Sequence, residues 1–268
     1  MIEILPAIAV RKEAPIPNND LRIEVGREIS LHALNLAETK YDSNIILLLQ
    51  ENPAVEAVTP EDILPVGVLA KITLKVKLPS GNYKVKFRLL QRVEIEDFIT
   101  ETPCFTVKYN PLNTVYGNPD EEVALVKMVI DELMPKAKEY LNNVDDVINQ
   151  IQSGATTEVV CDRIAFNLRS TDTDKSKYVL EADLNRRLNY ILQDLKHEQQ
   201  IIEIENKINE SVKKSIDESQ KEYYLREKMK AIQNELGDKA RQEEDVEKLR
   251  KALDEAKLPA NVYEKAKG

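Results

Sequence analysis

The chain has 268 residues, of which 42% are hydrophobic and 32% charged, and its formal net charge is −9. The apolar content is enough for a folded core, while the low Gly content excludes a fibrous chain. The acidic balance disfavours a globally basic nucleic-acid-binding protein.

The first 112 residues predict a β-rich domain that contains one helix. The spacing of Ile29, Ala33 and Leu36 predicts a helix over Arg27–Thr39. Alternating or continuous apolar runs predict the strands. These strands are Glu3–Val10, Leu21–Val25, Asn44–Gln50, Ala70–Leu78, Tyr83–Leu89 and Phe105–Tyr109.

Two of these strands form a predicted hairpin, because the turn sequence Pro79–Asn82 joins them. One face of the hairpin is expected to be apolar, through Ile72, Leu74, Val76 and Leu78. The other face is basic, and two interpretations stay open. It is either a solvated outer face, which we favour, or a surface for nucleic acid or acidic polypeptide. The basic residues are Lys71, Lys75, Lys77, Lys84, Lys86, Arg88 and Arg92.

The segment Pro15-Ile16-Pro17 lies between the first two predicted strands. Its prolines keep it out of a sheet ladder. It is either an exposed apolar tip that contacts extended polypeptide, or a stiff connection with Ile16 in the core. The candidate substrate contacts are therefore Pro15, Ile16 and Pro17, together with Lys75, Lys77, Lys84 and Lys86.

The remainder of the chain predicts helices, because there is no Pro from 136 to 258 and no Gly from 155 to 236. We expect a helical bundle over 113–195, a long interdomain helix over 196–237, and a helical linker over 238–268. The long pattern begins after Asp183 and ends before Gly237, a length of about 80 Å. Such a helix favours a coiled-coil contact or a spacer. Its candidate assembly residues are Tyr223, Tyr224, Leu225, Met229, Ile232 and Leu236.

Several functional classes have no support in the sequence. The longest apolar run, Ile45–Leu49, is far shorter than the ~20 residues of a membrane span, and the first residues lack the basic start of a signal peptide. The glycines fit neither of the two phosphate-binding loop motifs, GxxxxGK[ST] and GxGxxG, and the sequence contains no GxSxG nucleophile elbow. Two His and two Cys lack zinc-ligand spacing. We therefore expect no catalytic residue, cofactor or metal site in this chain. The two cysteines suit a reducing compartment, and we expect a cytoplasmic protein.

Several stretches resemble the N-terminal region of the Lon family of ATP-dependent proteases. Val66-Gly67 with Ala70-Lys71-Ile72 is similar to the family's VGTVAKI strand, and Leu78-Pro79 with Gly81, Val85 and Gln91-Arg92 is similar to its LPDG…V…LQR hairpin. The most specific match is Glu222–Gly237, which is nearly continuous with the family's EYYLREQLKAIQKELG block. The resemblance covers essentially the whole chain.

The resemblance implies an α+β fold. A β-rich, PUA-like substrate-recognition domain over 1–112 would precede a helical bundle and a long extended helix. In the family, an AAA+ module, which binds ATP and Mg, and a Ser-Lys protease domain follow. This chain would then not be an enzyme by itself. It would bind misfolded, damaged or short-lived regulatory proteins for a homohexameric quality-control and stress-response protease.

Two further functions stay open beside substrate recognition. The chain could serve mainly as an oligomerisation or spacer element through its long helix. It could also be a nucleic-acid-binding module that uses the hairpin 71–92, although the net charge disfavours this.

Overall fold

The structure is a computed structural model that describes residues 3–11, 13–169 and 174–255; the side chains of 236–243 and 253–254 also lie outside the described part. The chain divides into two compact units, Met1–Gln200 and Ile201–Gly268. The finer division at residues 112 and 195 stays a prediction.

Six strands of the first unit form one sheet, in the order β2-β5-β4-β3-β1-β6. Strand β5 also pairs with β6, which closes five of the strands into a barrel. Strand β5 is long enough to pair with both β2 and β6. Its first part pairs with β2 and its second part with β6. Closure removes most sheet edges. The strands are β1 (Glu3–Val10), β2 (Asp20–Val25), β3 (Asn44–Gln50), β4 (Ile63–Lys77), β5 (Tyr83–Thr100) and β6 (Phe105–Pro111).

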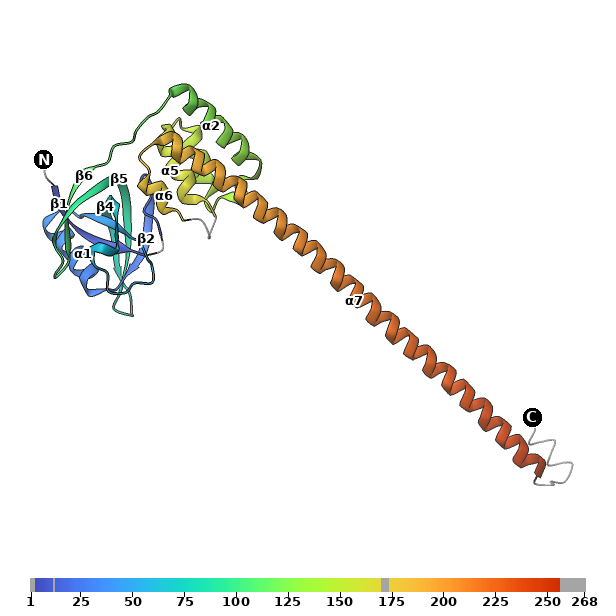
Figure 1. The fold of residues 1–268 in the computed structure, drawn as a ribbon. Coiled ribbons are helices and arrows are strands. Elements are labelled where there is room, and N and C mark those ends of the chain that lie inside the picture. The colour runs from blue at the N-terminus through green and yellow to red at the C-terminus, as the bar shows by residue number, and fades with distance from the viewer. Residues whose placement is uncertain (1–2, 12, 170–173, 256–268) are drawn as a thin grey trace. The chain divides into compact units, whose positions relative to one another are not determined.

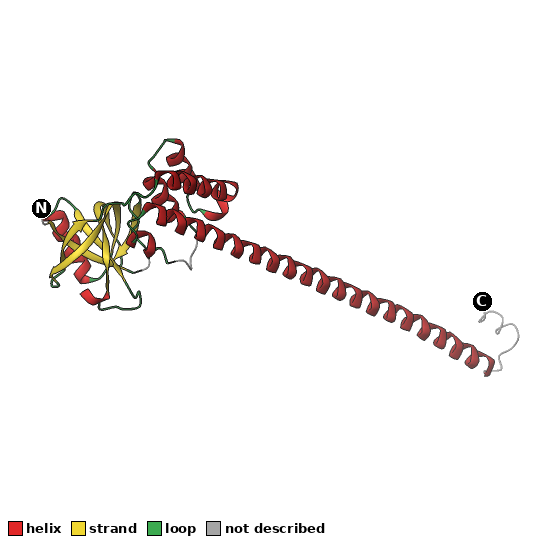
Figure 2. Cartoon of the chain, turned by 45° about the horizontal axis from the view of Figure 1, so that its top comes forward, coloured by secondary structure: helices red, strands yellow, loops and turns green. Residues whose placement is uncertain are grey.

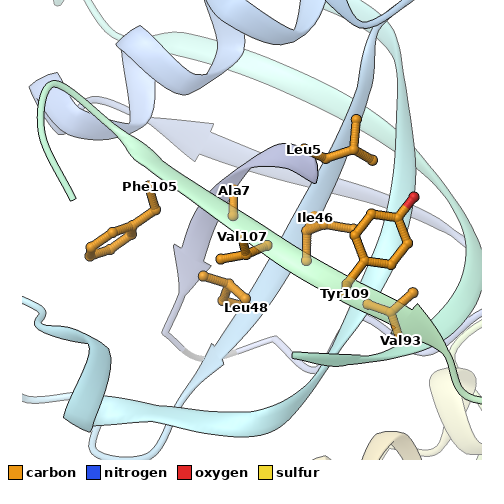
Figure 3. Packing of buried hydrophobic residues seen from close by; sticks show 8 residues of the cluster. All are labelled: Leu5, Ala7, Ile46, Leu48, Val93, Phe105, Val107 and Tyr109. Carbon is orange, nitrogen blue, oxygen red and sulfur yellow. The ribbon is translucent and has the colours of Figure 1, made fainter. Parts of the chain in front are cut away.

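The barrel interior is filled by apolar side chains from β1, β3, β5 and β6, as Figure 3 shows. The run Ile45–Leu49 on β3 is buried throughout, as expected of a strand covered on both faces. Each fully buried side chain of this size contributes about 1.5–3 kcal/mol relative to exposure. The cluster comprises Leu5, Ala7, Ile46, Leu48, Val93, Phe105, Val107 and Tyr109.

The hairpin of β4 and β5 differs from the prediction near its turn. Ile72 is buried as expected, but 54% of Leu74 and 47% of Val76 are exposed, so the expected apolar face is wrong there. The pairing register shifts between Ile72 and Leu74. A bulge of one residue moves every following side chain to the opposite face of the sheet. Lys75 therefore takes the inner, half-buried side. The turn uses Gly81 at a φ of +90°, a conformation that favours glycine.

Helices cover the barrel on two sides (Figure 1). Helix α1 (Glu28–Lys40) packs on β1 and β3 through Ala33, Leu34 and Ala37. The helices that follow β6 form a group beside the barrel, as Figure 2 shows in red. They are α2 (Pro119–Leu133), α3 (Ala137–Tyr140), α4 (Val144–Gln152), α5 (Thr157–Asn167), α6 (Ser176–Leu180) and the first turns of α7; short 3-10 turns η1 and η2 lie at Pro60–Asp62 and Met134–Lys136.

Helix α7 spans Leu184–Glu255, which is 72 residues. It therefore does not end at Gly237 as predicted. One glycine inside a helix costs about 1 kcal/mol, and strong helix formers flank it here. Up to Gln200 the helix packs in the first unit through Leu188, Ile191 and Leu195. In the second unit, all described side chains from 203 onward are exposed.

Candidate functional site

The segment Pro15-Ile16-Pro17 is buried, and Ile16 has no exposed surface. The side-chain amide of Asn19 donates to the carbonyls of Ile16 (3.2 Å) and Pro17 (2.8 Å) and thereby fixes the inward turn. This corrects the expectation of an exposed apolar tip. The three side chains offer no surface for direct substrate contact, and the core position of Ile16, the second alternative, is the one observed.

Two of the four candidate lysines are paired with carboxylates. Lys75 lies against Glu38 of helix α1, and its ammonium is 5.3 Å from the ring centre of Tyr83. Lys86 is 2.8 Å from a carboxylate oxygen of Asp20 on the neighbouring strand. The charge of the predicted basic face is therefore partly neutralised.

The other two candidate lysines are exposed. Lys77 and Lys84 form no ion pair with a described residue. Arg92 does not belong to the basic face, because only 2% of it is exposed. The predicted surface of seven cations is therefore smaller than the sequence indicated.

The bulge in β4 creates a surface that the sequence did not predict. Leu74 stands opposite Lys86 and Val76 opposite Lys84 in the β4–β5 register, so the four side chains share the outer face. We call these four residues the hairpin patch. Its apolar members are about half exposed and flanked by cations. Such a surface can bind extended polypeptide weakly and with little sequence preference.

The barrel and the helices of the first unit meet at a buried cluster that we call the ionic joint, formed by Arg92, Glu158, Asp162 and Arg187. Asp162 of α5 is 1% exposed and accepts two hydrogen bonds from Arg92 of β5, at 2.8 and 3.1 Å. Arg187 of α7 donates to the same carboxylate at 2.8 Å. Asn18, from the loop before β2, donates to it at 2.9 Å.

Glu158 forms the outer part of the ionic joint. Burial alone would raise the pKa of Glu158, but the hydrogen bond from Thr114 and the charges of Arg187 and Arg92 outweigh it, so the pKa is lowered. Tyr116 donates to the same carboxylate at 3.1 Å. The ionic joint therefore holds two carboxylates against two guanidinium groups, which suits a structural connection.

Sequence reasoning missed the ionic joint. The sequence places Arg92 on the exposed face of the hairpin, and it predicts no role for Asp162 or Arg187. The available signal was weak: Asp162 is an acid between Cys161 and Ile164 on the buried side of a predicted helix. Buried carboxylates generally need partners.

The candidate assembly residues lie on helix α7 in the second unit. Tyr223 (68% exposed), Tyr224, Leu225, Met229 and Ile232 all face solvent. The remaining candidate, Leu236, has a side chain outside the described residues. The surrounding helix carries ion pairs one turn apart, such as Glu222 with Arg226 (3.3 Å) and Glu227 with Lys230 (3.2 Å). Such pairs stabilise a solvated helix.

The family model for the ATP-dependent protease La (LON) substrate-binding domain matches residues 4–197. The chain belongs to this Lon family. The predicted family and α+β fold class are thereby confirmed. The Lon protease of Aster yellows witches'-broom phytoplasma is 45% identical over 265 residues, which are 98% of this chain and 34% of that relative. The Lon protease of Escherichia coli is 30% identical over 98% of this chain and 33% of its own length.

Among solved structures, the N-terminal domain of Mycobacterium avium complex Lon protease superimposes with a TM-score of 0.58 at 14% identity. It covers 72% of this chain and 98% of that one. At this identity the likeness shows the fold alone. The chain spans about a third of the length of the curated Lon relatives it matches. No helix among the described residues of this Lon chain is long and apolar enough to cross a membrane.

Proposed function

We propose that this chain binds unfolded or damaged polypeptide and delivers it to the ATPase and protease modules of a Lon-type protease. The observation that carries the proposal is the hairpin patch on a barrel that belongs to the Lon substrate-binding family. Exposed apolar side chains beside lysines can contact many sequences weakly. A tethered module of this kind raises the local concentration of substrate at the modules it is linked to.

The proposal is tested by fluorescence anisotropy of a labelled, permanently unfolded protein titrated with the chain, with its folded form as a control. Leu74→Glu together with Val76→Glu is expected to weaken binding about tenfold, because two apolar contacts are lost. Val123→Glu is the matched control, since Val123 of α2 is 71% exposed and lies outside the hairpin patch. Equal loss of binding in both variants would contradict a role for the hairpin patch.

Assembly is a second candidate function, favoured by the exposed apolar side chains of α7 such as Tyr223 and Met229. In this proposal the helix contacts other copies and supports a homohexamer. Sedimentation of the full chain and of a version ended after Gln200 separates the two functions. Self-association that disappears on shortening, with unchanged substrate binding, places assembly in the helix and recognition in the first unit.

Nucleic-acid binding has less support, because Lys75 and Lys86 are paired with acids. It would require affinity that falls steeply with salt and that charge reversal at Lys77 and Lys84 abolishes.

We further propose that the chain itself binds no cofactor and has no catalytic residue, that ATP and Mg belong to modules outside it, and that the protein works in the cytoplasm.

A further inference from the structure

Strand β4 has an unpaired edge near the hairpin turn. On one side it pairs with β5 as far as the turn, and on the other it pairs with β3 only up to Lys71, which stands opposite Asn44. The chain turns from helix α1 into β3 just before this point, at Asp42 and Ser43, whose φ angles are 50° and 64°. No described strand therefore lies beside Thr73–Lys77 on this side.

Two hydrogen bonds fix the direction of the peptide groups along this edge. The N–H of Ile72 donates to the carbonyl of Ser43 at 2.9 Å and so points away from β5. The N–H of Leu78 donates to the carbonyl of Asn82 at 2.8 Å, across the hairpin. Peptide groups alternate in direction along a strand, so both would point the same way in a regular strand. The bulge between Ile72 and Leu74 accounts for the difference.

The open edge presents the backbone groups of two residues. Counted back from Leu78, which bonds across the hairpin, the N–H and C=O groups of Lys77 and Lys75 point outward. No described residue outside the hairpin bonds these four groups. An extended polypeptide laid beside β4 would bond all four, which is the mode of recognition called strand addition.

The open edge adjoins the two apolar members of the hairpin patch. Leu74 and Val76 belong to the same stretch of β4, and about half of each side chain is exposed. The side chains of an added strand would stand beside them at the cross-strand distance of about 5 Å. Backbone partners and apolar contacts are therefore presented together by Thr73–Lys77.

Lysines determine which strand the edge accepts. Lys77 is exposed and forms no ion pair with a described residue, whereas the ammonium of Lys75 lies against Glu38. If two copies of the chain paired edge to edge, their lysines would be brought together, and like charges across strands are destabilising. Lysines on an edge act against such self-pairing. The same charge favours a strand that places an acidic side chain opposite Lys77.

The outer face of the hairpin adds positive charge beside the apolar pair. Lys84 stands opposite Val76 and forms no ion pair with a described residue. Its neighbour on β2, Glu24, is instead engaged by the side-chain amide of Asn82 at 2.7 Å. Lys84 and Lys77 are therefore two cations at the end of the hairpin that lack a described carboxylate partner.

We propose that the open edge of β4 binds polypeptide by strand addition and selects extended segments in which apolar residues alternate with acidic ones. The apolar side chains contact Leu74 and Val76, an acidic side chain faces Lys77, and backbone hydrogen bonds supply affinity that is independent of sequence. Most strands of a folded protein are already paired, so an unfolded polypeptide offers such a segment most readily. This inference rests on the proposed function and names the class of segment recognised.

Two short fluorescein-labelled peptides test the selection by charge. One contains Asp-Val-Thr-Val-Asp, which places an acid opposite Lys77 in either strand direction, and the other contains Lys-Val-Thr-Val-Lys. By anisotropy with the full chain, the acidic peptide is expected to bind about fivefold more tightly at low salt. Lys77→Glu should remove this preference, while Lys127→Glu, at an exposed lysine of α2, is the matched control and should preserve it. Equal affinity for the two peptides overturns the proposed selection.

N-methylation of the acidic peptide tests strand addition itself, because each methyl group removes one donor and blocks the approach of that amide to an edge. In an added strand, alternate amides face β4. Methyl groups on the facing amides are expected to weaken binding about tenfold, while those on the intervening amides change it less than about twofold. Equal effects at the two sets of positions overturn strand addition.

Two substitutions of Lys77 separate its backbone from its charge. Lys77→Gln and Lys77→Pro both remove the charge, but only proline removes the outward N–H and puts a ring in the path of an added strand. Proline is tolerated where the N–H of an edge strand faces solvent. Binding of the acidic peptide should fall about threefold for Lys77→Gln and about tenfold for Lys77→Pro. An equal loss in the two variants contradicts a role for the backbone edge.

Amide hydrogen exchange of the unsubstituted chain gives a readout that needs no variant. The amides of Lys75 and Lys77 should exchange about tenfold more slowly when the acidic peptide saturates the chain, because they gain hydrogen bonds. Unchanged exchange at both amides overturns the proposal. Sedimentation tests a second copy as the occupant: self-association that Lys77→Pro abolishes would assign the edge to that copy and also overturn the proposal.

Failure of this inference can be distinguished from failure of the proposed function. If labelled, reduced and carboxymethylated lactalbumin binds the chain while the acidic peptide does not, strand addition at β4 is wrong and general recognition of unfolded polypeptide stands. If neither probe binds, both proposals fail. If the acidic peptide displaces the unfolded protein and its N-methylated form does not, the open edge is part of the recognition surface.

Discussion

Replacing Asp162 with Asn is expected to destabilise the first unit strongly. The change conserves volume and removes the only charge among the described residues that lies at hydrogen-bond distance from both Arg92 and Arg187. The remaining acid, Glu158, is 3.9 Å and 3.6 Å from the two guanidinium groups. Removing one partner from a buried ion pair costs about 3–5 kcal/mol. For a unit of this size, that cost lowers the Tm by about 6–20 °C.

The measurement is thermal unfolding of the full chain followed by near-ultraviolet circular dichroism. Buried tyrosines such as Tyr140 and Tyr178 report on the first unit, whereas the solvated part of α7 dominates the far-ultraviolet signal. Asp97→Asn is the matched control, since Asp97 is exposed and has no ion pair with a described residue. Its effect should stay within about 0.5 kcal/mol. A Tm for Asp162→Asn within about 2 °C of the unsubstituted chain would refute the reasoning.

Three further outcomes are expected. Ile16→Ala should cost about 2–5 kcal/mol in urea unfolding, because Ile16 is fully buried; a cost below about 1 kcal/mol would favour an exposed segment. Cys161 should not react with a thiol reagent until the first unit unfolds, because burial raises its pKa to about 12; rapid labelling under native conditions would contradict this. Because the pKa of Glu158 in the folded chain is below the ordinary glutamate value of 4.5, its contribution to folding stability is complete above that pH and is lost as the pH falls through the folded pKa. Glu158→Gln should therefore flatten the loss of stability in acid, and an unchanged slope would exclude this contribution.

The local sequence pattern predicted the barrel strands well where a run of successive residues is continuously apolar or alternates regularly. The run Ile45–Leu49 was expected to be a buried strand, and β3 spans Asn44–Gln50. The hairpin was also expected, because a turn sequence joins two alternating segments. The exposed end of the hairpin was not expected, because the bulge after Ile72 depends on how β4 and β5 pair with each other. Alternation in sequence cannot indicate where one residue is skipped.

The candidate site shows the same difference between what a local pattern predicts and what contacts in the tertiary structure decide. For Pro15-Ile16-Pro17, the sequence is compatible with both exposure and burial. The segment is buried in the structure, where the hydrogen bonds from Asn19 hold its inward turn. Arg92 was interpreted as an exposed cation because its strand neighbours are lysines and arginines. Its carboxylate partner lies 70 residues later in the chain. No local pattern connects residues at such a separation.

The sequence by itself determined the α+β class, the order of strands and helices, the long α7 and membership of the Lon family, because periodicity, helix formers and family motifs are local properties. Tertiary structure alone decided barrel closure, the burial of Arg92 against Asp162, and the exposure of Leu74 and Val76 on the hairpin. These features depend on which distant segments pair and which do not. A pattern of apolar and polar residues describes one segment, whereas a strand edge or a buried charge is defined by its neighbours in space.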